Sequence, residues 1–170
     1  MDKIFRKIKI AFFFALLLPL LAMPGSHANN GVIVLMYHAV NDNILGEEQL
    51  FVKPAEFYNQ IKYLSDNSCT PITFVELSDY KAYKNPVMIT FDDGYIDNYF
   101  YAYPILKEFN FKATIFIVAG FINKPGYLSE AQIKEMSDII SFQCHTLTHP
   151  ELDTISNEEL EKECIYSKQI

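Results

Sequence analysis

The stretch from Val87 to Phe91 constrains the fold most, because its sequence, VMITF, has almost no polar face. A strand with one face in water alternates polar and apolar residues, whereas a strand covered on both faces is apolar nearly throughout. Strands of the second kind are typical of parallel sheets, whose crossover helices cover them. The stretch therefore predicts an α/β domain in which Asp92 and Asp93 follow the carboxyl end of a buried strand.

Other β-like stretches alternate with helical patterns along the chain, which is typical of parallel strands joined by crossover helices. With 170 residues, 50% of them hydrophobic, the chain has material for one globular domain and not for two. The further strands are expected at 32–37, 114–118 and 139–144, and helices at 54–65, 73–83, 99–109, 129–136 and from 156 to the end of the chain.

Residues 1–28 resemble a secretory signal peptide and are not counted in the fold. Basic residues precede an apolar run from Ile10 to Leu21, and Ser26 and Ala28 place small residues at positions −3 and −1 of a cleavage site. An anchor that stays attached is the alternative, but this run is shorter than the roughly 20 residues that span a bilayer. We expect export to the periplasm, cell surface or medium, contact with the membrane only through this segment, and a domain over 29–170.

The charge balance argues against nucleic acid as a partner. Four of the 14 basic residues and one of the 21 acidic residues lie in 1–28, so the rest of the chain holds 10 basic and 20 acidic residues, a formal net charge of −10. Binding of nucleic acid depends on neutralising phosphates with Lys and Arg. A neutral or cationic partner fits better, although an acidic surface is also an ordinary source of solubility.

Three cysteines, Cys69, Cys144 and Cys164, have spacings that match no zinc-ribbon pattern. An odd number leaves at least one of them unpaired. Cys144 directly precedes His145, and we interpret it as a small buried apolar residue at a strand end, with a metal-binding or redox role as the alternative.

Two polar motifs follow predicted strands. The first is Asp92-Asp93-Gly94, and the second is His145 with His149, four residues later and before Pro150. In parallel α/β sheets and barrels, functional residues collect at the carboxyl ends of strands. The two motifs are therefore expected to lie at the same edge of the sheet.

The chemistry of the four side chains predicts a metal site with its own base. Consecutive residues of an extended segment point in opposite directions, so Asp92 and Asp93 cannot easily bind one ion together. One carboxylate can bind while the other accepts a proton. Two imidazoles and one carboxylate form a site with open positions for water and substrate. Each motif alone has a simpler interpretation, since Asp-Gly often marks only a turn and His-x-x-x-His here lacks the Glu of zinc proteases.

The residues from Thr90 to Tyr95 (TFDDGY) resemble the first motif of the polysaccharide deacetylases, which are carbohydrate esterases, and those from His145 to Pro150 (HTLTHP) resemble the second. The segment from Val34 to His38 (VLMYH) is similar to the exported branch that acts on poly-β-1,6-N-acetylglucosamine. The resemblance implies a distorted (β/α) barrel and removal of acetyl groups from an N-acetylated polysaccharide. It implies Asp92 as the general base and a divalent metal, usually zinc, bound by Asp93, His145 and His149.

Some features of the family have no match in this chain. The later Arg-x-Pro-Tyr, Asp-Trp and Leu-x-His motifs are not found, and the chain has no Trp. The family's general acid is a His of the last motif, and none of the four histidines can be assigned to it. We therefore expect the N-terminal portion of the domain, an incomplete barrel of about four strands. His38 either lies at the mouth of the site or only braces a loop.

Three functions follow as alternatives. The first is a metal-dependent polysaccharide deacetylase, and the second is an inactive glycan-binding remnant of the same fold. The third is another metallohydrolase, for example of phosphate esters, with the same Asp and His ligands. The sequence indicates no protein partner.

Overall fold

The computed structural model describes residues 9–10, 31–43 and 48–168. The expected signal peptide, 1–28, and its cleavage site lie outside the described residues except for the two-residue strand β1 (Lys9–Ile10). Within the described residues, no helix combines the length and the apolar character needed to cross a membrane.

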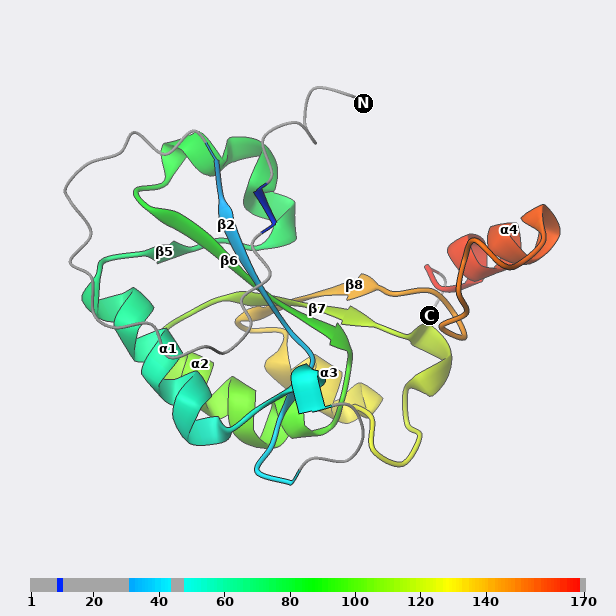
Figure 1. The fold of residues 1–170 in the computed structure, drawn as a ribbon, viewed down its shortest axis with the longest axis horizontal. Helices are drawn as coiled ribbons and strands as arrows, with labels where there is room; N and C mark the ends of the chain where they lie inside the picture. Colours follow the sequence, from blue (N-terminus) through cyan, green and yellow to red (C-terminus); the bar gives the residue numbers. More distant parts are fainter. Residues whose placement is uncertain (1–8, 11–30, 44–47, 169–170) are drawn as a thin grey trace.

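Six parallel strands of the described residues form the main sheet (Figure 1). The central strand is β6 (Pro86–Asp93), which pairs with β2 (Ile33–Tyr37) on one side and β7 (Ala113–Ile117) on the other, and β8 (Ile140–Cys144) pairs with β7. All four predicted strands are thus confirmed. Among the described strands, β1 and β8 are the two ends of the order and the sheet does not close, which is consistent with an incomplete barrel.

Short strands raise the total above the four expected. β5 (Thr70–Pro71) pairs with β6, and β1 pairs with β2. A separate two-stranded sheet joins β3 (Ala39–Val40) to β4 (Phe51–Val52). Pairs of residues are too short to show the two-residue periodicity from which a strand is predicted, so the sequence could not indicate them.

The predicted helices are present, with changes of type and length. The α-helices are α1 (Pro54–Asp66), α2 (Tyr103–Glu108), α3 (Glu130–Met136) and α4 (Asn157–Tyr166). Tighter 3₁₀ turns form η2 (Glu48–Leu50), η3 (Phe74–Ala82) and η5 (Ala119–Phe121), and a π-helix, η4 (Asn98–Ala102), leads into α2.

The last helix is shorter than predicted. The sequence predicts a helix that continues to the end of the chain, but α4 ends at Tyr166, and the amide of Lys168 then donates to Ile165 O in a tighter turn. Its predicted start is correct, since the Ser156 hydroxyl accepts from the Glu159 amide and the Glu159 carboxylate accepts from Ser156. Such a capping box satisfies amides that have no partner within the helix.

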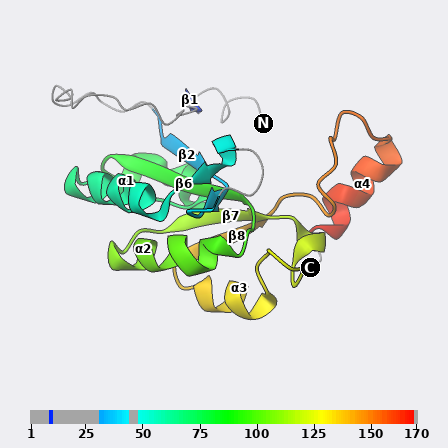
Figure 2. The ribbon, with the colours of Figure 1, turned by 60° about the horizontal axis from the view of Figure 1, so that its bottom comes forward.

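Alternate residues of the central strand enter two different cores. Ile89 and Phe91 are fully buried in the larger core, to which α1, α2 and α3 also contribute. Met88 packs in a smaller core with Val32 and Ile72, against η3. Figure 2 shows α1, α2 and α3 as a layer along the sheet and α4 beyond the end of β8. Burial on both faces explains why β6 is apolar almost throughout.

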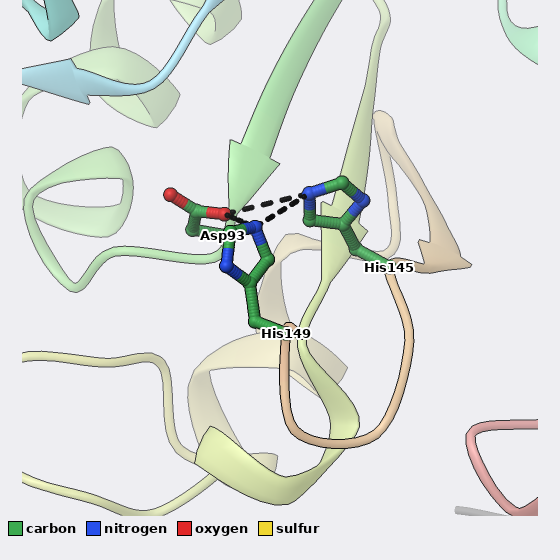
Figure 3. A group of neighbouring side chains, drawn as sticks. All are labelled: Asp93, His145 and His149. Atoms are coloured by element: carbon green, nitrogen blue, oxygen red, sulfur yellow. Dashed lines mark hydrogen bonds and ion pairs between the residues drawn. The ribbon is translucent and has the colours of Figure 1, made fainter. Parts of the chain in front are cut away.

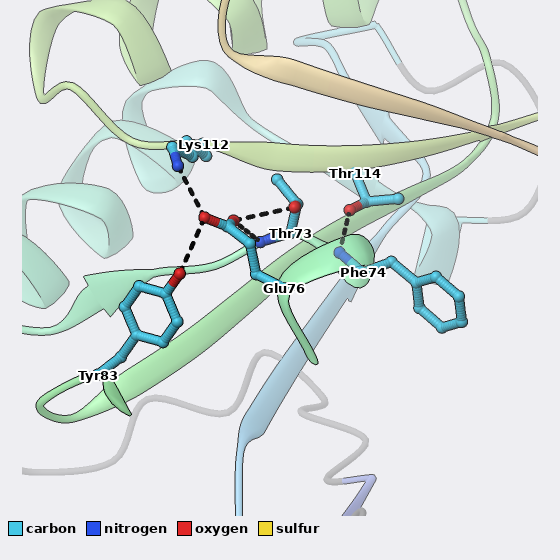
Figure 4. Close-up of polar contacts among 6 residues, drawn as sticks. All are labelled: Thr73, Phe74, Glu76, Tyr83, Lys112 and Thr114. Atoms are coloured by element: carbon cyan, nitrogen blue, oxygen red, sulfur yellow. Dashed lines mark hydrogen bonds and ion pairs between the residues drawn. The ribbon is translucent and has the colours of Figure 1, made fainter. Parts of the chain in front are cut away.

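A polar cluster fastens η3 to the neighbouring strand β7 (Figure 4). The carboxylate of Glu76 accepts from the amide of Thr73, from Lys112 Nζ at 2.9 Å and from the Tyr83 hydroxyl at 3.2 Å. Burial by itself raises the pKa of Glu76, but the hydrogen bonds from Lys112 and Thr73 outweigh it and bring that pKa to about 2. The carboxylate therefore stays charged at neutral pH.

Candidate metal centre

The end of β6 turns sharply at the two aspartates. Asp93 has a φ of 70° and Gly94 a φ of 76°, and the Gly94 amide donates to Asp92 O at 2.9 Å. A left-handed conformation at a residue other than glycine is strained and is retained where the surroundings hold it. A Cβ atom on Gly94 would also meet the side chain of Ile117 at 3.3 Å. The turn thus separates the two carboxylates and needs the glycine that follows them.

The second motif lies in a loop after β8 rather than on a helix. The amide of His145 still donates to Ile117 O at 2.7 Å, so the loop starts in register with the sheet. Thr146 and His149 both have positive φ, 67° and 61°, and the His149 amide donates to the Thr146 hydroxyl at 3.0 Å. This tight turn brings both imidazoles to one side.

Three donor atoms meet at the edge of the sheet (Figure 3). Asp93 Oδ1 lies 3.6 Å from His145 Nε2 and 3.4 Å from His149 Nε2, and the two Nε2 atoms lie 3.2 Å apart. Asp93 Oδ1 is buried and has no hydrogen-bond partner among the described residues. The tertiary structure thus joins a strand end and a loop more than 50 residues apart in the sequence.

The donor set fits a divalent metal ion. A carboxylate oxygen and two imidazole nitrogens are zinc ligands, and donors at the usual bond lengths around a tetrahedral zinc ion lie roughly 3.3–3.5 Å apart. The three observed separations are close to that value. The side chains of His145 and His149 are 34% and 50% exposed, which leaves the site accessible from solvent. A buried carboxylate oxygen without a hydrogen bond is also costly unless a cation or donor faces it.

Asp92 lies next to this donor set but is not part of it. Its Oδ2 is 3.9 Å from His38 Nε2, too far for a hydrogen bond, and both side chains are 18% exposed. Burial raises the pKa of the Asp92 carboxyl and the charge of Asp93 adds to the rise, whereas His145 and His38 lower it. A carboxylate with a raised pKa at the edge of an open site is suited to accept a proton.

A hydrogen bond to its backbone carbonyl fixes the position of His38. Its carbonyl oxygen accepts from Asn98 Nδ2 at 2.9 Å, and Asn98 is fully buried at the start of the π-helix η4. The side chain of His38 faces Asp92. The structure thus places His38 beside Asp92, where the sequence left its position open.

The expected burial of Cys144 needs correction. Cys144, at the end of β8, is partly buried rather than buried, and among the described strands β8 pairs with β7 alone. In the part of the chain that the structure describes, the possible metal ligands are Asp93, His145 and His149, without Cys144. Cys69, Cys144 and Cys164 are all free thiols.

Sequence reasoning missed the residues that support the second motif. Ala119 and Gly120 donate their amides to the carbonyl oxygens of Thr146 and Leu147 at 3.0 and 2.8 Å. Glu163 of α4 accepts hydrogen bonds from the other side of the same loop. Gly120 follows a predicted strand, so the sequence could have indicated it as a residue near the site. Glu163 is one of four glutamates in α4, and no sequence pattern distinguishes it from the other three.

Fold and site together define a parallel α/β protein with a donor set of two histidines and one aspartate at the carboxyl edge of its sheet. A family model described as polysaccharide deacetylase matches residues 79–170. YxkH of Bacillus subtilis (strain 168) is 38% identical over 143 residues, with 81% of this chain and 50% of the relative covered. The chain therefore belongs to the polysaccharide deacetylase family.

Another curated relative and two solved structures are also similar to this chain. The poly-beta-1,6-N-acetyl-D-glucosamine N-deacetylase of Staphylococcus aureus (strain MSSA476) is 30% identical, with 71% of this chain and 49% of the relative covered. The crystal structure of BC0361, a polysaccharide deacetylase from Bacillus cereus, matches with a TM-score of 0.76 and 39% identity, over 81% of this chain and 45% of that one. The structure of the Streptococcus pyogenes deacetylase PplD in complex with acetate matches with a TM-score of 0.71 and 34% identity. The match covers 80% of this chain and 65% of that one. The chain spans about half the length of the curated relatives it matches.

Proposed function

We propose that this chain carries the metal-binding and proton-accepting side chains of a deacetylase that removes acetyl groups from an N-acetylated polysaccharide. The observation that carries the proposal is the convergence of Asp93, His145 and His149 at separations of 3.2–3.6 Å, with Asp92 beside them. The family membership and the relative named for poly-β-1,6-N-acetylglucosamine support a polymer of that kind as substrate.

The geometry supports a role for each of these residues. Asp93, His145 and His149 would hold a divalent ion, and zinc suits a set of one carboxylate and two imidazoles. When bound, such an ion supplies Lewis acidity, which polarises an acetyl carbonyl and lowers the pKa of a coordinated water. Each histidine would carry its own proton on Nδ1, since Nε2 faces the other donors.

Asp92 would act as the general base. Its carboxylate would accept the proton of the attacking water, and its separation from the three donors leaves it free for that role. Burial, which raises the pKa of Asp92, makes its carboxylate a better proton acceptor. His38, facing Asp92 at 3.9 Å, would line the mouth of the site.

The test is acetate release from β-1,6-linked N-acetylglucosamine oligomers, measured with added zinc or cobalt and with a chelator. Release that requires the metal supports the proposal. A folded, metal-loaded chain that binds the oligomers without release would instead favour a glycan-binding remnant. Release of phosphate from phosphate esters, without acetate release, would favour another metallohydrolase.

A further inference from the structure

Helix α4 contacts the rest of the structure in an unusual way. Its one buried residue, Glu163, is polar and 8% exposed, and Ser167, which directly follows the helix, is polar and 6% exposed. Ile165 and Tyr166 of the helix are 45% and 48% exposed. A surface helix normally buries an apolar stripe against the core. Figures 1 and 2 show α4 apart from the layered helices, beyond the end of β8. Apolar packing therefore does not explain why α4 lies where it does.

The carboxylate of Glu163 provides the contact instead. Its Oε2 accepts from the amides of Leu147 and Thr148 at 2.7 and 2.8 Å, and its Oε1 accepts from the Thr148 hydroxyl at 2.6 Å. Hydrogen bonds to a carboxylate are stronger than those between neutral groups. None of the ion pairs found among the described residues includes Glu163, so these three donors compensate the burial of its charge.

The two amides belong to residues between the proposed ligands His145 and His149. The opposite side of the same loop is held through carbonyl oxygens, with Gly120 donating to Leu147 O at 2.8 Å. The amides of the loop thus donate hydrogen bonds to Glu163, and its carbonyl oxygens accept hydrogen bonds from η5. Thr146 and His149 have positive φ, and such conformations persist where the surroundings over-determine them.

We propose that Glu163 is a positioning residue of the metal centre: its carboxylate holds the loop that sets the spacing of His145 and His149. The inference rests on the proposed metal site and extends it to a helix that contributes no ligand. It predicts that loss of Glu163 lowers metal affinity because the two imidazoles are no longer held together before the ion binds.

The experiment compares Glu163→Ala and Glu163→Gln with Glu161→Gln, a matched change of charge at an exposed residue of the same helix. Zinc and cobalt affinities are measured without substrate by titration calorimetry and by the cobalt absorption spectrum. For Glu163→Ala we expect a loss of about 10- to 100-fold, as for other outer residues that orient metal ligands. Glu163→Gln keeps an acceptor for the amides and should lose less, and Glu161→Gln should stay within about twofold of wild type.

Hydrogen exchange of the metal-free protein provides a second readout. Exchange in 145–150 should become faster in Glu163→Ala while exchange in β6 and β7 stays unchanged, which also shows that the variant is folded. If Glu163→Ala does not fold, Thr148→Val, which removes one of the three hydrogen bonds, should weaken cobalt binding by a smaller factor.

The outcomes separate this inference from the proposed function. Wild-type affinity in Glu163→Ala, together with unchanged exchange, would overturn the inference and leave the metal centre intact, provided that His145→Ala abolishes binding. Failure of the wild-type chain to bind either ion would overturn the metal centre itself, and the role of Glu163 with it.

Discussion

The amide of Gly120 donates to the carbonyl oxygen of Leu147 over 2.8 Å, and a Cβ atom on Gly120 would lie 2.5 Å from that same oxygen. Real Cβ atoms do not approach a backbone oxygen so closely, so any side chain here must displace the loop between the two histidines. The close approach therefore connects η5, which follows β7, to the geometry of the proposed metal ligands.

Gly120→Ala is expected to destabilise the fold by about 1–3 kcal/mol, as insertion of a methyl group into a packed site does. It should also weaken metal binding, because the displaced loop carries His149. Gly126→Ala is the matched control. There φ is 89° but a Cβ would meet nothing within 4 Å, so stability should fall without a change in metal affinity. Urea unfolding and zinc titration of both variants measure the two effects separately.

Asp92→Asn should abolish acetate release while sparing metal affinity. Asn keeps the shape of the side chain but cannot take the proton, and loss of a general base lowers the rate roughly 10²- to 10⁴-fold. His145→Ala should lose the metal and the activity together. Asp42→Asn, at an exposed residue, is the control for loss of one negative charge. Metal loss with retained activity in Asp92→Asn would show that the roles of Asp92 and Asp93 are assigned the wrong way round.

Acid should remove the stabilising contribution of the Glu76 cluster. The pKa of Glu76 is lowered to about 2 in the folded protein, against an ordinary value of 4.5, so its charged form stabilises the fold above about pH 4.5. That contribution decreases as the pH falls from about 4.5 towards 2. Glu76→Gln should therefore lower the free energy of unfolding at pH 7 more than at pH 3. Urea unfolding at both pH values measures this, and an equal loss at both would contradict the argument.

Export predicts a specific product at the N-terminus. Expressed with its own first residues in a bacterial host, the chain should be processed near Ala28 and recovered outside the cytoplasm. Mass spectrometry of the purified protein measures the cleavage point. Replacing Ala28 by a bulky residue such as Phe should prevent cleavage there, whereas the same change at exposed Ala82 should not. An intact N-terminus in the wild-type protein would favour the uncleaved anchor.

The four long strands and the site edge could be predicted because their causes are local. A strand buried on both faces must be apolar throughout, so the segment before Asp92 is recognisable without knowledge of its neighbours. Likewise, the Ser156 capping box marks a helix start within four residues. Where the cause is not local, prediction failed. The end of α4 at Tyr166, the two-residue strands and the π-helix at Asn98 depend on partners elsewhere in the chain.

For the site, the sequence alone supplied the chemical groups and their order along the chain, because carboxylates and imidazoles after strand ends are visible as residue types. The resemblance to the family implied Asp93 rather than Asp92 as the metal ligand, but only the tertiary structure brings Asp93 next to the two histidines and shows that Glu163 and Gly120 bond to their loop. The physical reason is that hydrogen bonds and close approaches between distant segments depend on how the elements pack, and a glutamate in a helix has the same local pattern whether it is exposed or buried.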